Sequence, residues 1–105
     1  MSQHSVNDPG YVAISNVTTS TQLVAAPGAD YRIVVLGYKL QLDTTGEYTL
    51  YSAATALTGT MELAADTPDG AFCTAGILRC AENEALNLTA TTAANGFLRY
   101  VIARA

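Results

Sequence analysis

The sequence has no tryptophan, a single histidine and few charged side chains. Charged residues make up 13% of the 105 residues, whereas about a quarter is usual. The one histidine, His4, stands in a polar N-terminal segment, where an imidazole lacks the fixed neighbours that a general base needs. Catalysis of the Ser-His-Asp or Cys-His kind would need that same residue. The composition therefore predicts that the protein is not an enzyme.

Positive charge is also scarce. The formal net charge is -4, and the five cations are scattered along the chain: Arg32, Lys39, Arg79, Arg99 and Arg104. Phosphate binding needs a basic patch, so we expect no nucleic acid as a partner. No apolar run is long enough to span a membrane, and the first ten residues lack the basic and apolar regions of a signal peptide. We expect no membrane partner, and synthesis in the cytoplasm without export.

Only two cysteines are present, Cys73 and Cys80. With six residues between them and no histidine nearby, they do not form a metal motif. They fall on two short expected strands that are neighbours, so a cross-strand disulfide is geometrically possible. In a protein made in the cytosol, two small buried hydrophobic side chains are the favoured interpretation.

The remaining polar clusters predict no cofactor and no metal. Asp66 and Asp69 flank a turn and offer two carboxylates, whereas calcium sites gather more ligands at a defined spacing. A solvated turn is the favoured interpretation. Glu82 and Glu84 have the composition of a glycosidase carboxylate pair, but we interpret them as neighbouring surface acids.

The most informative stretch that is present runs from Tyr31 to Asp43. It is rich in β-branched and aromatic residues and lacks proline, which predicts a long strand. Its even positions are apolar throughout and are expected to line the core: Val34, Leu36, Tyr38, Leu40 and Leu42. The odd positions begin with Ile33 and Val35, pass Gly37 and then become polar. We expect a bulge or bend at Gly37, and either the N-terminal segment or a second subunit over Ile33 and Val35.

The rest of the chain predicts short strands separated by turns. They are expected over residues 11–15, 21–26, 47–52, 60–65, 71–74, 77–80, 84–91 and 97–104, with residues 53–59 as a loop and a hairpin turn at Asn95-Gly96. Turns every eight to twelve residues and the lack of a convincing helix predict an all-β fold. We expect one antiparallel, jelly-roll-like β-sandwich of about eight strands over residues 11–105, preceded by a flexible arm over residues 1–10.

Tyrosine supplies six of the eight aromatic residues. Tyrosine suits both interfaces and sugar-binding sites because its ring is flat and amphipathic. Tyr38, Tyr48 and Tyr100 are expected to fill the core. For Tyr31 and Tyr51, the core and a contact surface remain equally supported alternatives.

Three stretches together resemble a group of small tailed-bacteriophage virion proteins. They are Tyr31 to Leu36, Ala56 to Ala65, and Asn83 to Leu88 continuing to Asn95 to Val101. The similarity covers roughly residues 20 to 104 and lies in strand and turn patterns rather than in catalytic signatures. The chain departs from that group at Cys73 to Cys80, where the group has aromatic and glycine-rich sequence.

The resemblance implies a capsid decoration, or cement, protein on the surface of the virion. Such a protein would bind the major capsid protein and stabilise capsomer contacts, and a homotrimer is the favoured oligomer. The few charges, and an arm able to reach a neighbouring subunit, agree with this role. The expected contact residues, from the central strands and the arm, are Tyr31, Ile33, Val35, Tyr51, His4 and Asp8.

A second function remains open at this stage. The same sandwich suits a tail or fibre accessory module that binds host-surface glycan through exposed tyrosines and the loops at one end. The two alternatives differ in where the protein sits on the particle and in how many copies it has.

Overall fold

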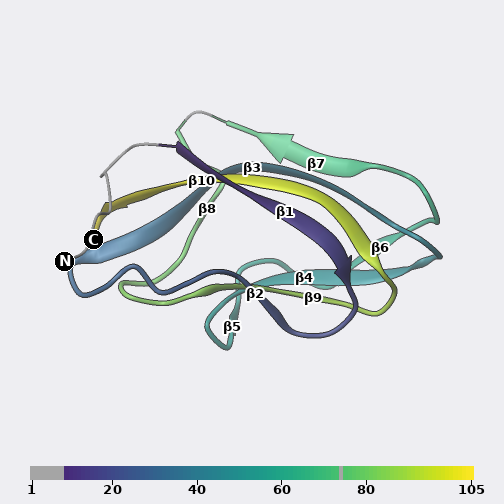
Figure 1. Cartoon of the computed structure of the whole chain (residues 1–105), viewed down its shortest axis with the longest axis horizontal. Coiled ribbons are helices and arrows are strands. Elements are labelled where there is room, and N and C mark those ends of the chain that lie inside the picture. The colour runs from purple at the N-terminus through teal and green to yellow at the C-terminus, as the bar shows by residue number, and fades with distance from the viewer. Residues whose placement is uncertain (1–8, 74) are drawn as a thin grey trace.

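The computed structural model describes residues 9–73 and 75–105, and these form a sandwich of two five-stranded sheets (Figure 1). Sheet A has the strand order β1 (Pro9–Val17), β10 (Ala94–Arg104), β3 (Tyr31–Leu42) and β7 (Asp69–Phe72), and β8 (Leu78–Arg79) also pairs with β3. Sheet B has the order β2 (Thr21–Val24), β9 (Leu86–Ala90), β4 (Gly46–Ser52) and β5 (Thr55–Ala56), and β6 (Met61–Leu63) also pairs with β4.

The predicted all-β sandwich is confirmed. Every pair of named strands is antiparallel, and the first four strands alternate between the two sheets. The last two strands run back beside the first two, β9 against β2 and β10 against β1, as in a jelly roll. No described residue belongs to a helix long and apolar enough to cross a membrane.

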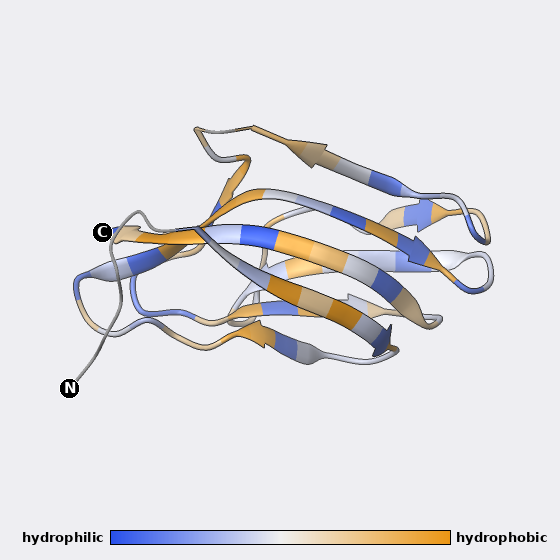
Figure 2. Ribbon diagram, turned by 45° about the horizontal axis from the view of Figure 1, so that its top comes forward, coloured by the Kyte–Doolittle hydropathy of each residue, from blue (hydrophilic) through white to orange (hydrophobic). Residues whose placement is uncertain are grey.

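The core lies between the inner faces of the two sheets. Alternate residues of a strand point to opposite faces, and apolar and polar bands accordingly alternate along the strands in Figure 2. Leu50, Leu86 and Leu88 from sheet B are fully buried against Leu40 and Leu98 from sheet A. Burial of this apolar surface holds the two sheets together.

The expected bulge is present at Leu36, one residue before Gly37, and it reverses the faces expected for the first half of β3. Arg99 of β10 pairs with Gly37, but the next residue, Tyr100, pairs with Val35, so Leu36 is an extra residue. An extra residue changes the parity of the strand. Ile33 and Val35 therefore share the core face with Tyr38, whereas the expectation placed them on the opposite face.

Val34 and Leu36 consequently lie on the outer face of β3, where the chain's own edge segment packs against Val34. β7 and β8 pair with consecutive parts of β3 and are separated by residues 73–77. Within that segment Cys73 N–H donates to the Leu36 carbonyl at 2.8 Å. A Cβ on Gly76 would lie 2.5 Å from Val34 Cγ1, so glycine allows the segment to lie directly over Val34.

Three other expectations are wrong in detail. Residues 55–56 form the short strand β5 instead of a loop, and β1 begins at Pro9, inside the expected arm. Asn95 and Gly96 are inside β10, and the turn precedes them. Glycine is needed at 96 because a Cβ there would lie 1.9 Å from the Lys39 carbonyl oxygen, so the glycine marks a close approach of two strands.

A hydrogen-bonded chain links the two sheets inside the core. Tyr38 of β3 and Tyr48 of β4 are both buried, their hydroxyl oxygens are 3.1 Å apart, and Tyr48 donates to Asp69 of β7 at 2.6 Å. The two rings pack edge to face. The expected core placement of Tyr38 and Tyr48 is confirmed, and Tyr100 is partly buried against the core.

Both cysteines are free thiols. Cys73 is exposed in the segment after β7, and Cys80 is buried in the core cluster. Burial raises the pKa of the Cys80 thiol, an effect that a hydrogen bond with Ser52 partly offsets and the nearby Glu84 carboxylate reinforces. The favoured interpretation of a small buried hydrophobic side chain is correct for Cys80 alone.

Candidate interaction surface

The outer face of sheet A gathers the exposed aromatic side chains of the described chain. Register partners in an antiparallel sheet lie on the same face. One row across the sheet runs from Tyr11 to Arg99, Gly37 and Phe72. The next row runs from Ala13 to Phe97, Lys39 and Gly70. We define the aromatic face by five of these side chains: Tyr11, Lys39, Phe72, Phe97 and Arg99.

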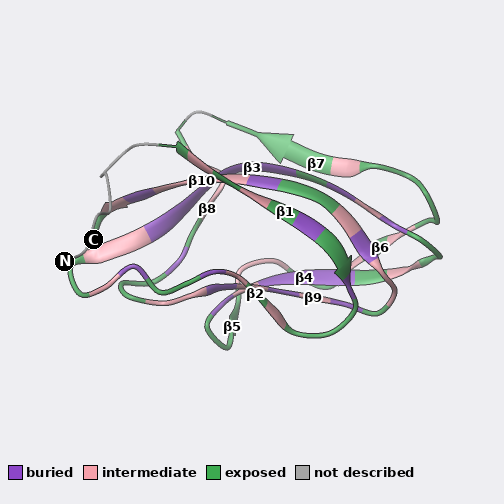
Figure 3. Ribbon diagram, viewed as in Figure 1, coloured by how far each residue is buried: buried purple, intermediate pink, exposed green. Residues whose placement is uncertain are grey.

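Two phenylalanines form the apolar centre of the aromatic face. Phe72 is 55% exposed and Phe97 is 40% exposed, and their ring centroids are 6.0 Å apart with the planes tilted by 32°. The Phe72 ring lies on Gly37, where a Cβ would come within 2.0 Å of the ring. β7, which carries Phe72, is exposed along most of its length (Figure 3). The pair is thus a contiguous apolar patch held on a rigid sheet.

Cations border this patch. The Arg99 guanidinium carbon lies 5.8 Å from the centre of the Tyr11 ring, and Tyr11 itself is 67% exposed. This distance is within the range of a cation–π contact. The exposed Lys39 lies between the two phenylalanine-bearing strands in the register. Aromatic rings beside arginine are the composition that protein interfaces favour at their centres.

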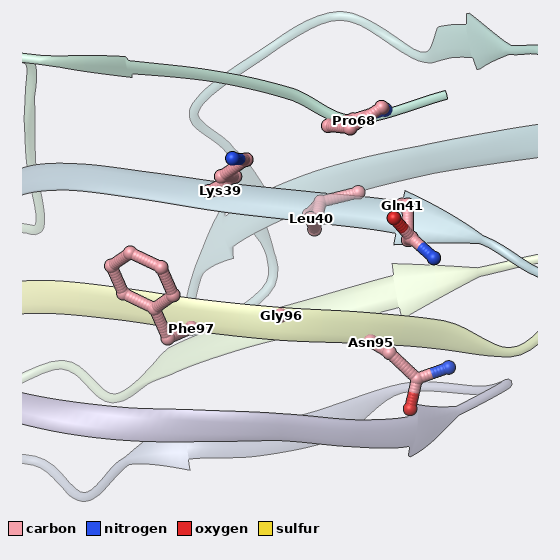
Figure 4. Close-up of a pocket in the computed structure, with 7 residues that line it drawn as sticks. All are labelled: Lys39, Leu40, Gln41, Pro68, Asn95, Gly96 and Phe97. Carbon is pink, nitrogen blue, oxygen red and sulfur yellow. The ribbon is translucent and has the colours of Figure 1, made fainter. Parts of the chain in front are cut away.

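A shallow hollow of about 260 Å³ opens on this face beside Lys39. Figure 4 shows Phe97 of β10, Lys39 of β3 and Pro68, just before β7, around it, with Gln41 and Asn95 at its other end. The Asn95 amide already joins two segments: its oxygen accepts from Asn16 N–H at 3.0 Å and its nitrogen donates to Asp43 at 3.3 Å. A second hollow of about 360 Å³ lies between Lys39 and Phe72. The two hollows suit the insertion of side chains from a partner.

The structure does not bring the predicted contact residues together. Ile33 and Val35 are both 0% exposed in the core, so the prediction of a subunit contact is wrong for them. The bulge at Leu36 is the reason, because it turns both side chains inward. Tyr31 is partly buried against the core and has the Arg104 guanidinium 5.7 Å from its ring centre. Tyr51 is half-buried on β4 of the other sheet.

His4 and Asp8, the two contact residues expected in the arm, lie outside the described residues. Their role stays a prediction. The arm boundary changes, because Pro9 and Gly10 pair with Val101 and Tyr100 as part of β1.

The aromatic face was not assigned from the sequence, although one signal pointed to it. The apolar face expected for the last strand, with Leu98 and Ile102, is confirmed as buried. That assignment places Phe97 and Arg99 on the opposite face. Phe72 and Tyr11 could be added only once the register of β7 and β1 was known.

The acidic clusters have structural partners. The Asp69 carboxylate accepts a hydrogen bond from Tyr48 at 2.6 Å. Glu82 accepts from Asp30 N–H at 2.8 Å, and Glu84 accepts from the Ser52 hydroxyl at 2.6 Å. Among the described residues, no group of three or more histidine, cysteine or acidic side chains could hold a metal ion.

Comparisons with known proteins found no match for this chain. No model of a protein family matches the sequence, and neither a curated protein nor a solved structure matches it.

Proposed function

We propose that the protein is a capsid decoration protein of a tailed bacteriophage, which binds the major capsid protein through the aromatic face and stabilises contacts between capsomers. The virion context comes from the resemblance of the three sequence stretches. The observation that carries the binding role is the exposed Phe72–Phe97 pair bordered by Lys39 and Arg99. A monomer rarely exposes contiguous large apolar side chains unless they contact a partner.

The architecture suits a binding role that needs no chemistry. The aromatic face is built on four hydrogen-bonded strands, so its side chains are positioned before binding and little conformational entropy is lost on contact. A shell holds many copies of such a contact. Even if each contact is modest, together they stabilise the assembled state by mass action. The same proposal includes a homotrimer. It also includes a contact between residues 1–8 and a neighbouring subunit.

The number of copies per particle tests this proposal. Purified virions are separated on a gel, and the band of this chain is quantified against the major capsid protein. We expect one copy per shell subunit or a simple fraction of that number, because a decoration protein follows the shell lattice. Absence of the chain from the particle would refute the proposal.

Binding of host glycan by a tail module is the second candidate. The hollow beside Phe97 favours it, because an aromatic wall with Lys39 and Gln41 nearby can stack on a sugar ring and bond its hydroxyls. This alternative predicts a ratio of only a few per cent in the same gel. The commitment of the Asn95 amide to Asn16 and Asp43 removes one sugar-binding group and favours the protein partner.

A further inference from the structure

The fold brings together cations that are scattered along the sequence. All five lie on strands of sheet A: Arg32, Lys39, Arg79, Arg99 and Arg104. Among the described residues, the strands of sheet A contain one acid, Asp69, and its carboxylate accepts a hydrogen bond from the buried Tyr48 hydroxyl. A chain with a formal net charge of -4 therefore has one sheet whose charges are nearly all positive.

Four of these cations point to the outer face of sheet A. Arg99 and Lys39 belong to the aromatic face, in adjacent rows of the register. Arg32 and Arg79 lie on the other side of the bulge. Arg79 pairs with Val34, and Arg32 is two residues before Val34, so all three side chains are on the outer face. We call the four side chains the cationic stripe, which is about 20 Å long between Arg32 and Lys39 at ~3.3 Å per residue.

The described residues supply no carboxylate that forms an ion pair with the cationic stripe. Arg79 donates to the Ala75 carbonyl at 3.5 Å, and Arg99 lies against the Tyr11 ring. The Nε atoms of Arg32 and Arg99 are buried without a hydrogen-bond partner in the described part of the chain. Since these guanidinium groups have lost part of their hydration, a carboxylate brought by a partner would stabilise them.

The outer face of sheet B carries the opposite charge. Glu47 of β4 and Glu62 of β6 are direct cross-strand partners, and both are exposed. Within the described chain, no cation belongs to a strand of sheet B. An acidic surface therefore attracts the outer face of sheet A and repels that of sheet B. This asymmetry would orient the protein on such a surface before contact.

We propose that the outer face of sheet A docks on an acidic protein surface, with the Phe72–Phe97 pair at the apolar centre and the cationic stripe bonded to carboxylates around it. The acidic surface would belong to the capsid protein, so the inference rests on the proposed function. It extends the interface beyond the aromatic face, to Arg32 and Arg79. Charges at the border of an interface determine the choice and orientation of the partner more than the affinity.

A single nucleic-acid strand is the other polyanion that aromatic and basic side chains can bind. The Phe72 and Phe97 rings, however, lie 6.0 Å apart with a tilt of 32°, so they form one patch instead of separate platforms for successive bases. The two hollows beside Lys39, of about 260 and 360 Å³, suit inserted side chains. These features favour a protein surface.

Attachment to capsid shells that lack this protein, measured by sedimentation at two salt concentrations, tests the proposal. At about 0.1 M NaCl, where charges act over ~10 Å, the double variant Arg32→Gln, Arg79→Gln should attach about tenfold more weakly than the wild type. At about 1 M NaCl, where this range falls to ~3 Å, the wild type should attach more weakly and most of the difference should vanish. Arg79→Gln alone, at an exposed position, should show a smaller loss in the same direction.

Arg104→Gln is the matched control. It removes the same charge, but Arg104 is two residues after the buried Ile102 and so on the other face of β10, where it lies against the Tyr31 ring. This variant should attach like the wild type. Thermal unfolding of every variant shows that it is folded. Equal weakening by Arg104→Gln would show that the total charge matters instead of the cationic stripe, and would overturn the proposal.

The remaining outcomes separate this inference from the proposed function. Attachment of the wild type that neither salt nor the double variant weakens would overturn the acidic surface and leave the decoration role intact. No attachment of the wild type at either salt concentration would overturn the decoration role, and the acidic surface with it. Tight binding of single-stranded oligothymidine, measured by fluorescence anisotropy and lost in the double variant, would assign the face to nucleic acid.

Discussion

Val35 shows how one residue position decides between two accounts of the molecule. In the structure its side chain is fully buried in the core of a single chain. Val35→Asp would place an unpaired carboxylate there, at a cost of several kcal/mol, which is comparable with the ~5–15 kcal/mol stability of a typical domain. We expect this variant to be unfolded, as measured by circular dichroism and amide NMR.

The matched control for Val35→Asp is Gln22→Asp, which introduces the same charge at an exposed position of β2. It should change the free energy of unfolding by less than about 0.5 kcal/mol. A Val35→Asp chain that stays folded as a monomer and only loses assembly would contradict the observed placement and restore the subunit-contact interpretation of this residue.

Tyr48 couples the fold to alkaline pH. Burial, together with its hydrogen bonds to Asp69 and Tyr38, raises the pKa of Tyr48 far above its ordinary value. Tyrosines of the unfolded chain lose their protons near pH ~10, while native Tyr48 keeps its proton. Unfolding therefore releases a proton in this range, and the free energy of unfolding should fall as the pH rises above ~10.

Tyr48→Phe isolates this contribution. The variant should be less stable at pH 7 by about 1–3 kcal/mol, because Asp69 and Tyr38 lose their hydrogen-bond partner. Its stability should then decline less steeply above pH ~10 than that of the wild type, as measured by urea unfolding at a series of pH values. An equally steep decline in both proteins would show that Tyr48 is not the residue responsible.

At the scale of the strands, periodicity predicts most elements but not their exact faces. The apolar alternation of residues 86–90 and 97–104 depends on local pattern alone, and both strands are found. The face of the first half of β3 depends on an extra residue at Leu36, which is defined only by the pairing with β10. Gly37 indicates that a bulge is near. It does not show whether the extra residue comes before or after the glycine, and so which residues change face.

Short strands, and close approaches between the backbones of two strands, also cannot be predicted from the local sequence. β5 has two residues and exists because they pair with Tyr51 and Ser52. Asn95-Gly96 has the composition of a tight turn, yet its glycine serves the contact with the Lys39 backbone. The aromatic face shares this property, because it gathers side chains from four strands and so has no signature in any one stretch of sequence.

At the scale of the whole molecule, one sandwich carries the proposed binding surface on the outer side of one sheet. The aromatic face extends across β1, β10, β3 and β7 of sheet A. The side chains of this face point away from the core between the sheets, so substitutions on it should leave the fold intact. Binding and folding can therefore be tested separately.

Attachment to capsid shells tests the central claim most directly. Shells lacking this protein are incubated with the wild-type chain or with the double variant Phe72→Ser, Phe97→Ser, and occupancy is quantified after sedimentation. Tyr51→Ser, on the other sheet, is the control. We predict normal attachment of the wild type and of Tyr51→Ser, and at least about thirtyfold weaker attachment of the double variant, as expected when hot-spot aromatics are removed. Full occupancy by a folded double variant would contradict the account.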